Sequence, residues 1–443
     1  MEQTGLFRRF AKYAWLSVCG MIGLSFYILA DTFFVAQGLG SSGLAALNLA
    51  IPVYNGLAGV GQMLGMGGAI KYAILKSQNE EQRANVLFTN TMLLAAGSSV
   101  LFVLAGLFAS DWITAALGAD AQVYAMTRVY LRTLCLFAPA FMLNYVLQSF
   151  VRNDGAPQLA MAALISGSLV NVVLDYVFIF PCGMGMFGAV LATGFSPVTG
   201  ILIMLPYWFG SRRGFRFVKT GLVGDQVRSI LSLGFPTLIG QLSSGITIIT
   251  FNTIMLRLAG NLGVAAYGVI TNIALVVASV YNGIGQGIQP LISESYGRNR
   301  MKEARQVLAY AMITMAAVSG LLYVCLWGYA EPIAEVFNSE HLAELRQRAA
   351  EGMKLYFLSN LFLGFNTILA MFFAATERVI PAHVLSLLRG LFLIVPAAFF
   401  MAYAWGLTGV WLAVPVTEGT VAILGAAVYL GKKRDRARRR EPG

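Results

Sequence analysis

The chain has 443 residues, of which 58% are hydrophobic and 12% are charged, and its mean hydropathy is +0.71. Soluble domains carry about 25% charged residues, so this composition excludes a soluble globular protein and indicates an integral membrane protein. The net charge of +11 does not by itself indicate nucleic-acid binding, because the basic residues follow a membrane pattern described below. Four cysteines stand singly in apolar segments and predict neither disulfides nor a metal site.

Apolar segments long enough to cross a bilayer recur along the whole chain. About 20 apolar residues cross the hydrocarbon core as a helix, whereas a membrane β-barrel would need alternating segments of about 10 residues. The long segments with few charges therefore predict an all-α protein with twelve transmembrane helices. Their expected ranges are 13–36, 44–70, 86–108, 124–149, 159–180, 188–210, 230–256, 264–293, 307–328, 354–375, 383–404 and 409–430.

The basic residues indicate the orientation of these helices. With the spans above, 24 of the 31 Lys and Arg residues lie on the side that holds both termini, 6 lie on the other side, and Arg389 lies within the membrane. The positive-inside rule therefore predicts that both termini are cytoplasmic. The KKRDRARRR tail is then a topology anchor that also favours anionic lipid, so we expect the lipid bilayer, and not nucleic acid, as the partner.

The second half of the sequence repeats the first at an offset close to 220. GLAALN at 43–48 is echoed by GVAAYG at 263–268, and GMFGAVLAT at 185–193 by GLTGVWLAV at 406–414. In the register of the later part, GAPQLA at 155–160 faces VIPAHV at 379–384. Six spans in each half give the halves the same orientation, related by a pseudo-twofold axis along the membrane normal.

The repeat predicts the domain organisation. We expect two pseudo-symmetric six-helix lobes that move by alternating access around a shared cleft. The expected units are an N-lobe at 1–210, a basic cytoplasmic linker at 211–228, a C-lobe at 229–431 and a basic cytoplasmic tail at 432–443.

Two acids stand inside predicted spans of the first half, Asp31 and Asp175. Ser168, Asn171 and Asp175 are spaced three and four residues apart, so they share one face of a helix. An ionisable group inside the membrane costs ~2.5 kcal/mol or more, which makes it a candidate functional residue. At the corresponding positions the second half has phenylalanines, so the asymmetry indicates an ion site in the N-lobe. The alternative is that both acids only bind buried polar groups.

Several segments resemble the multidrug and toxic compound extrusion (MATE) family of cation-coupled drug antiporters. They are DTFFVAQGLGSSGLAAL, RNDGAP, NVVLD followed by GMFGAVLAT, and IGQGIQPLISESYG, and the resemblance extends over essentially the whole chain. It implies twelve helices in two lobes and a multi-pass protein of the bacterial or archaeal plasma (inner) membrane. One departure is Tyr176, which stands where the family often has Pro and leaves the expected bend of that helix open.

The resemblance also implies that Asp31, Asn171, Asp175 and Thr193 bind the coupling ion. Two carboxylates in a medium of low dielectric constant either share a proton or hold a cation. Na⁺ would need oxygen ligands, which all four side chains carry, whereas a proton needs less geometry. The sequence leaves H⁺ and Na⁺ open and predicts no other cofactor.

Other polar residues in the spans have weaker assignments. Tyr27, Asn144 and Gln148 are candidates for the substrate cavity. Arg389 and Glu418 are expected to form a structural ion pair, because each otherwise lacks a partner inside the membrane. Arg152 and Asp154 are expected to organise the connection between the fourth and fifth spans.

The function predicted from these features is secondary active multidrug efflux by a monomer that is not an enzyme. It would export amphipathic, mostly cationic compounds in exchange for inward H⁺ or Na⁺. One alternative is a flippase for lipid-linked saccharides, for which we would expect a cationic central cavity or additional helices. A remote alternative is an intramembrane aspartyl protease with Asp31 and Asp175 as its dyad, although neither acid stands in a YD or GxGD sequence.

Overall fold

The computed structural model describes residues 2–210, 213–337 and 342–438, with side chains described between residues 5 and 431. These residues form helices and short connections and contain no strand. Residues 211 and 212 of the predicted linker, and the side chains of the predicted basic tail, lie outside the described part.

The helices of the N-lobe come first along the chain. They are α1 (Glu2–Ser77), α2 (Glu81–Phe108), α3 (Ser110–Ala116), α4 (Tyr124–Leu136), α5 (Ala138–Asn153), α6 (Pro157–Ile179) and α7 (Gly185–Phe209). The C-lobe follows with further helices, a 3₁₀ turn η1 and a π-helical turn η2. They are α8 (Gly224–Gly297), α9 (Met301–Gly328), α10 (Ala330–Val336), α11 (Ala343–Tyr356), η1 (Phe357–Ser359), α12 (Asn360–Ala375), α13 (Val379–Leu387), η2 (Leu388–Phe392) and α14 (Ile394–Arg438).

Three long helices are interrupted by a single glycine. α1 breaks at Gly40 (φ 65°, ψ −160°), α8 at Gly260 (φ 61°, ψ −155°) and α14 at Gly406 (φ 57°, ψ −136°). Only glycine adopts these angles without steric strain. Each of the three breaks lies between two predicted spans. α4 and α5 bend by 50° at their junction and together cover the fourth predicted span. Each of the twelve predicted spans thus has a helical segment.

The helix positions repeat as the sequence predicts. The breaks at Gly40 and Gly260 are separated by the offset of the sequence repeat, and so are the first residues of α2 and α9, which are both 28 residues long. The offset is slightly larger between the starts of α6 and α13, and the π-helical turn η2 shifts the register once more. Asp175 therefore corresponds to Ala398, which is fully buried, and not to Phe399 as the sequence register suggested. Either residue is apolar, so the acid remains without a counterpart.

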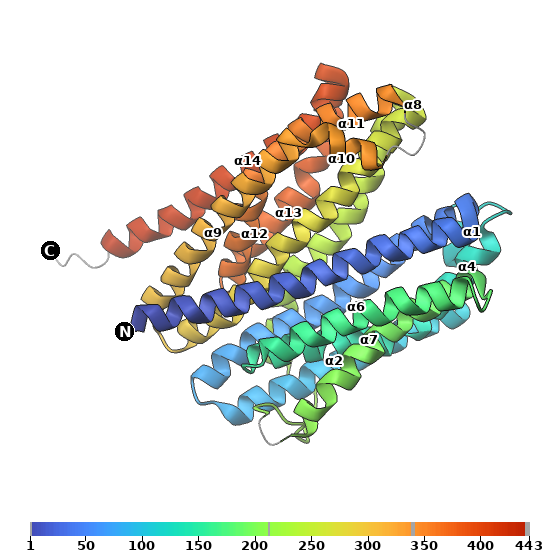
Figure 1. Cartoon of the computed structure of the whole chain (residues 1–443). Coiled ribbons are helices and arrows are strands. Elements are labelled where there is room, and N and C mark those ends of the chain that lie inside the picture. The colour runs from blue at the N-terminus through green and yellow to red at the C-terminus, as the bar shows by residue number, and fades with distance from the viewer. Residues whose placement is uncertain (1, 211–212, 338–341, 439–443) are drawn as a thin grey trace.

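The two lobes contact each other along α1 and α8. Helices α1 to α7 lie on one side of this contact and α8 to α14 on the other (Figure 1). Gly67 leaves no room for a side chain, because a Cβ atom there would clash with the carbonyl oxygen of Ile230. At Gly287, the equivalent position of the second half, a Cβ would lie 2.6 Å from the carbonyl oxygen of Tyr13. Small residues of this kind allow the backbones of membrane helices to approach closely.

Polar contacts join the lobes at the end that carries most of the basic residues. The side-chain pairs that bridge the lobes there include Arg9 with Glu294 (2.5 Å), Lys71 with Glu377 (2.6 Å), Arg152 with Gln286 (2.6 Å), and Asn153 with Gln289 through two hydrogen bonds (2.9 and 3.0 Å). Toward the ends near Gly40 and Gly260 the lobes diverge (Figure 1). The two lobes are therefore held together by side-chain contacts at the basic end of the structure.

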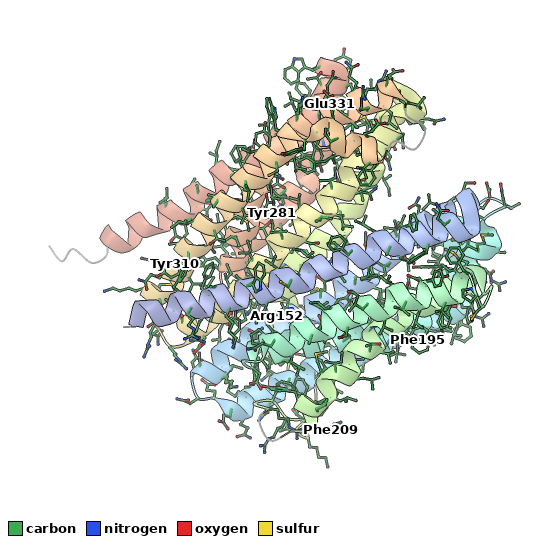
Figure 2. The ribbon with its side chains drawn as sticks, in the orientation of Figure 1. Arg152, Phe195, Phe209, Tyr281, Tyr310 and Glu331 are labelled. Atoms are coloured by element: carbon green, nitrogen blue, oxygen red, sulfur yellow. The ribbon has the colours of Figure 1, made fainter. Side chains whose placement is uncertain are left out.

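The outer faces of the lobes are apolar. Phe195 and Phe209 lie on the outer face of the N-lobe (Figure 2), and their side chains are 37% and 76% exposed. Large exposed apolar side chains are costly in water but are expected where a helix faces lipid.

The described part of the linker packs against the N-lobe. Phe215 is fully buried, with its ring centroid 4.7 Å from that of Phe88 and 6.1 Å from that of Tyr72. The backbone N–H of Gly214 donates to Asp154 Oδ2 at 2.6 Å. α8 begins at Gly224, so residues 224–228 of the predicted linker are helical.

The close approach at Gly67 can be tested with a single methyl group. Gly67→Ala should force α1 and α8 apart and lower the stability by roughly 1–3 kcal/mol, the usual cost of overpacking. Gly56→Ala is the matched control on α1, because a Cβ at that position would meet no atom within 4 Å. The control should be neutral or stabilising, since alanine favours a helix by roughly 0.5–1 kcal/mol over glycine. Thermal midpoints of the purified variants check this, and equal midpoints for the two would contradict it.

Candidate functional site

The four residues predicted to bind the coupling ion lie together in the N-lobe. Asp31 comes from α1, Asn171 and Asp175 from α6, and Thr193 from α7. All four are buried, with exposed fractions between 0 and 7%. The carboxyl groups of Asp31 and Asp175 are in hydrogen-bonding contact. A cluster expected from sequence is thus assembled from three helices.

Hydrogen bonds hold the cluster in place. In the orientation that satisfies its neighbours, the Asn171 amide nitrogen donates to Asp175 Oδ2 at 3.1 Å, and its oxygen accepts from the backbone N–H of Thr193 at 3.1 Å. The Thr193 hydroxyl donates to the carbonyl oxygen of Ala189 at 3.1 Å. Tyr130 of α4 lies close to Thr193 and was not predicted, because a tyrosine in an apolar span gives no signal that separates it from ordinary core residues.

The two carboxyl groups are not fully satisfied by the protein. Asp31 Oδ1 and Asp175 Oδ1 are buried and have no hydrogen-bond partner among the described residues. No described Lys, Arg or His side chain forms an ion pair with either acid. Two carboxylates in contact in a buried site cannot both stay ionised cheaply, so the arrangement is suited to take up a proton or a small cation.

α6 continues through the acid without a break. Asp175 and Tyr176 both lie inside the single helix Pro157–Ile179. Tyr176 is 53% exposed, and its ring centroid lies 6.2 Å from that of Phe34 and 5.5 Å from that of Phe180. With Tyr in place of Pro, the backbone N–H is kept and the helix has no cause to kink here.

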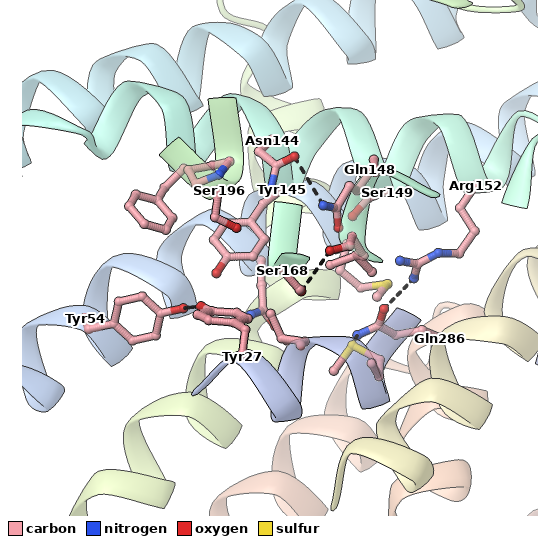
Figure 3. A pocket seen from close by; sticks show the side chains of 18 residues that line it. Tyr27, Tyr54, Asn144, Tyr145, Gln148, Ser149, Arg152, Ser168, Ser196 and Gln286 are labelled. Atoms are coloured by element: carbon pink, nitrogen blue, oxygen red, sulfur yellow. Dashed lines mark hydrogen bonds between the residues drawn. The ribbon is translucent and has the colours of Figure 1, made fainter. Parts of the chain in front are cut away.

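A cavity of about 60 Å³ with a mixed polar and apolar lining lies mainly in the N-lobe (Figure 3). The three predicted cavity residues, Tyr27, Asn144 and Gln148, all line it. The Tyr27 hydroxyl is 2.9 Å from that of Tyr54, and Gln148 Nε2 donates to Asn144 Oδ1 at 3.2 Å. Tyr27 stands one helical turn before Asp31, so α1 links the cavity to the acid pair.

Arg152 lies in this cavity, contrary to the expectation that it organises a connection. It is in the last turn of α5, is only 4% exposed, and donates from Nη1 to Gln286 Oε1 of α8 at 2.6 Å (Figure 3). Asp154 does organise that region. It accepts hydrogen bonds from Tyr72 (2.6 Å) and Tyr207 (2.7 Å) and pairs with Lys76. The donors around Asp154 come from residues other than Arg152. Arg152 points away from the connection, toward Gln286 of the other lobe.

The C-lobe contains the ion pair predicted between Arg389 and Glu418. Nε and Nη2 of Arg389 are both 3.1 Å from Glu418 Oε1. Asn366 Nδ2 donates to Glu418 Oε2 at 2.7 Å, and Arg389 Nη1 donates to Thr367 Oγ1 at 3.2 Å. Arg389 stands in the π-helical turn η2. In contrast to the acid pair, this carboxylate is compensated by a cation and an amide.

The comparison with known families agrees with the geometry. The sequence profile of the MatE family matches residues 17–177 and 236–400, one segment in each half and more than half of the chain. The chain belongs to the MATE family. MATE proteins are membrane transporters, so this MATE chain is not an enzyme and the aspartyl protease alternative is wrong.

Several known proteins resemble this MATE chain over nearly its whole length. Multidrug export protein MepA of Staphylococcus saprophyticus is 23% identical over 439 residues, covering 98% of this chain and 96% of the relative. MepA of Staphylococcus aureus is 23% identical over 441 residues, with the same coverage.

Solved structures share the fold. A MATE crystal structure in complex with MaL6 has a TM-score of 0.91 at 23% identity and covers 98% of this chain and 97% of that one. A transporter of the MOP superfamily from Pyrococcus furiosus, described as having a binding pocket of reverse polarity, has a TM-score of 0.90 at 23% identity, with 98% and 96% covered.

The ion pair of the C-lobe gives a stability prediction. Glu418→Leu leaves the partly buried cation of Arg389 uncompensated and should cost about 3–5 kcal/mol. The double variant Arg389→Leu with Glu418→Leu should recover most of this loss, since replacing both charges by apolar groups is often neutral. Glu344→Gln, which breaks an exposed pair with Arg348, is the control and should cost about 0–1 kcal/mol. Thermal midpoints decide, and a double variant less stable than Glu418→Leu would refute a purely structural pair.

Proposed function

We propose that this chain is a monomeric multidrug efflux transporter of the plasma membrane that exports amphipathic small molecules in exchange for inward H⁺. The relatives named multidrug export proteins support the export of drugs, because their similarity extends over 98% of this chain. The acid pair in the N-lobe supports coupling to a cation.

The observation that carries the proposal is the buried contact between Asp31 and Asp175. Each acid has one oxygen without a donor, and neither has a cationic partner among the described residues. A proton held between the two carboxyl groups removes their repulsion and provides the missing donor. When the proton leaves, the site carries a second negative charge that favours the next uptake.

H⁺ makes fewer demands on the site than Na⁺. Na⁺ would need several oxygen ligands in a fixed arrangement, by analogy with other hard cations. The Asn171 amide oxygen accepts from a backbone N–H and the Thr193 hydroxyl donates to a carbonyl oxygen, and each oxygen keeps a lone pair. Two carboxyl groups alone suffice for a proton.

The lobes supply the alternating access. The positive-inside rule assigns the basic end to the cytoplasm, so the tied end of the structure would be the cytoplasmic one and the state would be outward-facing. In this state the acid pair takes up a proton from outside. When the cross-lobe contacts at the cytoplasmic end break, the proton can leave to the inside. Each elementary charge that moves inward across 100 mV supplies ~2.3 kcal/mol for export.

A flippase for lipid-linked saccharides is the second candidate. Such a protein would be expected to have a cationic central cavity, and the buried Arg152 places a positive charge in the N-lobe cavity, beside Gln286 of the other lobe. Lipid scrambling without a response to an ion gradient would favour it.

Transport measured in proteoliposomes tests the coupling. Efflux of a fluorescent cationic dye, ethidium, should respond to an imposed pH gradient and not to a Na⁺ gradient. Asp31→Asn and Asp175→Asn should each reduce gradient-driven transport to the level of empty liposomes. With an amide in place of one acid, the pair can no longer alternate between a state that shares one proton and a state in which both carboxyl groups are ionised. Asp111→Asn is the matched control, since this acid pairs with Arg128 at 2.6 Å on an exposed face, and it should transport normally.

Three results would contradict parts of the proposal. Transport that responds to a Na⁺ gradient alone would show that the coupling ion is Na⁺ and not H⁺. Normal pH-driven transport by both acid variants would remove the pair from the mechanism. Wild-type protein that scrambles lipid and moves no dye under either gradient would favour the flippase.

A further inference from the structure

Four of the helices that reach the basic end of the structure close with the same hydrogen-bond pattern. Just beyond each helix, one residue has a positive φ, and its backbone N–H and that of the next residue donate back to the last turn. This is the Schellman motif, whose left-handed residue is usually glycine and sometimes asparagine. Here the left-handed residues are Asn79 after α1 (φ 62°), Gly155 after α5 (φ 101°), Asn299 after α8 (φ 57°) and Glu377 after α12 (φ 54°).

Glu377 is the residue that does not suit this position. A side chain in the left-handed conformation collides with its own backbone, and asparagine tolerates it because its short polar side chain can form local hydrogen bonds. Glutamate has neither advantage, so its backbone is strained. Asparagine or glycine at 377 would relieve that strain without changing the turn.

The repeat shows that glycine is compatible with the same turn. α5 ends at Asn153 and α12 at Ala375, so Gly155 and Glu377 each stand two residues beyond the end of equivalent helices. The bonds that close the turns are also equivalent. The N–H after Gly155 donates to the carbonyl oxygen of Val151 at 3.1 Å, and the N–H after Glu377 donates to that of Phe373 at 2.8 Å. The acid is therefore not needed for the turn itself.

The side chain of Glu377 has a partner in the other lobe. Lys71 Nζ of α1 donates to Glu377 Oε1 at 2.6 Å, and the two side chains are 23% and 30% exposed. The pair thus joins the first helix of the N-lobe to the turn between α12 and α13 of the C-lobe. A strained residue that is kept where an unstrained one would fit indicates a functional constraint, and the contact with Lys71 supplies one.

This ion pair is also suited to open and close. Both groups are partly exposed, so water can solvate them when they separate and the cost of separation is small. The neighbouring pair of Arg9 and Glu294 differs, because Glu294 keeps a second partner of its own lobe, Arg298 at 3.0 Å, when Arg9 leaves. Separation of the lobes therefore leaves Glu294 paired, whereas it changes the state of both Lys71 and Glu377.

We propose that Lys71 and Glu377 form a latch that holds the cytoplasmic ends of the lobes together and sets the fraction of molecules that are closed to the cytoplasm. The inference rests on the proposed function, because alternating access gives the latch its role, and it names the contact that regulates access to the acid pair from inside. It also explains the strain: glycine at 377 would stabilise the turn and lose the latch.

Distances between two spin labels measure the opening directly. The labels are attached through Gln82→Cys and Lys302→Cys, which are equivalent exposed positions in the first turns of α2 and α9. The four native cysteines are replaced by serine or alanine. Double electron–electron resonance is recorded on the full-length protein in nanodiscs, without substrate or ion gradient. The wild-type pair should give mainly the short distance of the closed state.

Variants of the two residues should raise the ratio of open to closed molecules. Glu377→Gly and Lys71→Met each remove the attraction and should raise this ratio roughly 1.4- to 5-fold, the range expected for a partly exposed ion pair. Lys71→Glu places two acids opposite each other and should raise it further. The exchange of both residues, Lys71→Glu with Glu377→Lys, should return the ratio to that of wild type. Asn79→Gly is the matched control, because it makes the same backbone change at an exposed residue, and it should leave the ratio unchanged.

Thermal midpoints separate a latch from a contact that only supports the fold. Glu377→Gly loses the ion pair and the strain together, whereas Lys71→Met loses the ion pair and keeps the strain. The glycine variant should therefore melt at a higher temperature than the methionine variant, although both open more readily than wild type. A glycine variant that melts below the methionine variant would overturn the proposal, and so would unchanged distances in Lys71→Glu or a charge exchange that fails to restore the closed state.

The latch and the coupling ion can be tested separately, because the distances are recorded without a gradient. In an Asp31→Asn background, Glu377→Gly should raise the open fraction by the same factor as in wild type. An increase that disappears in this background would mean that the acid pair alone sets the equilibrium, and it would overturn the latch. Dye export that ignores a pH gradient would contradict the proposed coupling and would leave the spin-label distances as the measure of the latch.

Discussion

Polar groups inside a membrane must find their partners within the protein, because lipid offers none, and this constraint organises the structure. Glu418 meets it with Arg389 and Asn366, and Asp154 meets it with tyrosines, a lysine and the linker backbone. The pair of Asp31 and Asp175 does not, since one oxygen of each acid lacks a donor among the described residues. A buried pair of acids without a cationic partner is the arrangement on which the proposed ion exchange rests.

The backbone of the protein is symmetric, whereas its buried charges are not. The glycine breaks at Gly40 and Gly260 and the close approach at Gly67 and Gly287 recur at the same offset, so both lobes use the same construction. The acid pair occurs in one lobe alone among the described residues, and Asp175 corresponds to the buried Ala398. Symmetric backbones suit the rocking of two similar bodies, and in the proposed mechanism the asymmetric charges would confine the coupling to one of them.

Three features of the N-lobe are connected through its own helices. α1 carries Asp31 of the acid pair and Tyr27 of the cavity one turn earlier, and α5 carries Arg152 from the cavity to the contact with Gln286. In the mechanism that we propose, proton uptake and the separation of the lobes would therefore act on neighbouring parts of the N-lobe. This arrangement offers a short physical route for coupling, without a relay through distant residues.

The sequence alone determined the twelve spans and the repeat, because apolar length and helical spacing are local properties. The resemblance of its segments to the MATE family implied that Asp31, Asn171, Asp175 and Thr193 belong to one candidate site. The sequence also led to the partners Arg389 and Glu418, since few charges stand inside the spans and those few must pair. Only the tertiary structure decided that Tyr130 joins the cluster, that the linker packs on the N-lobe and that Arg152 turns into the cavity. The direction of a side chain at a helix end depends on what the rest of the chain brings next to it, here the linker around Asp154 and α8 of the other lobe.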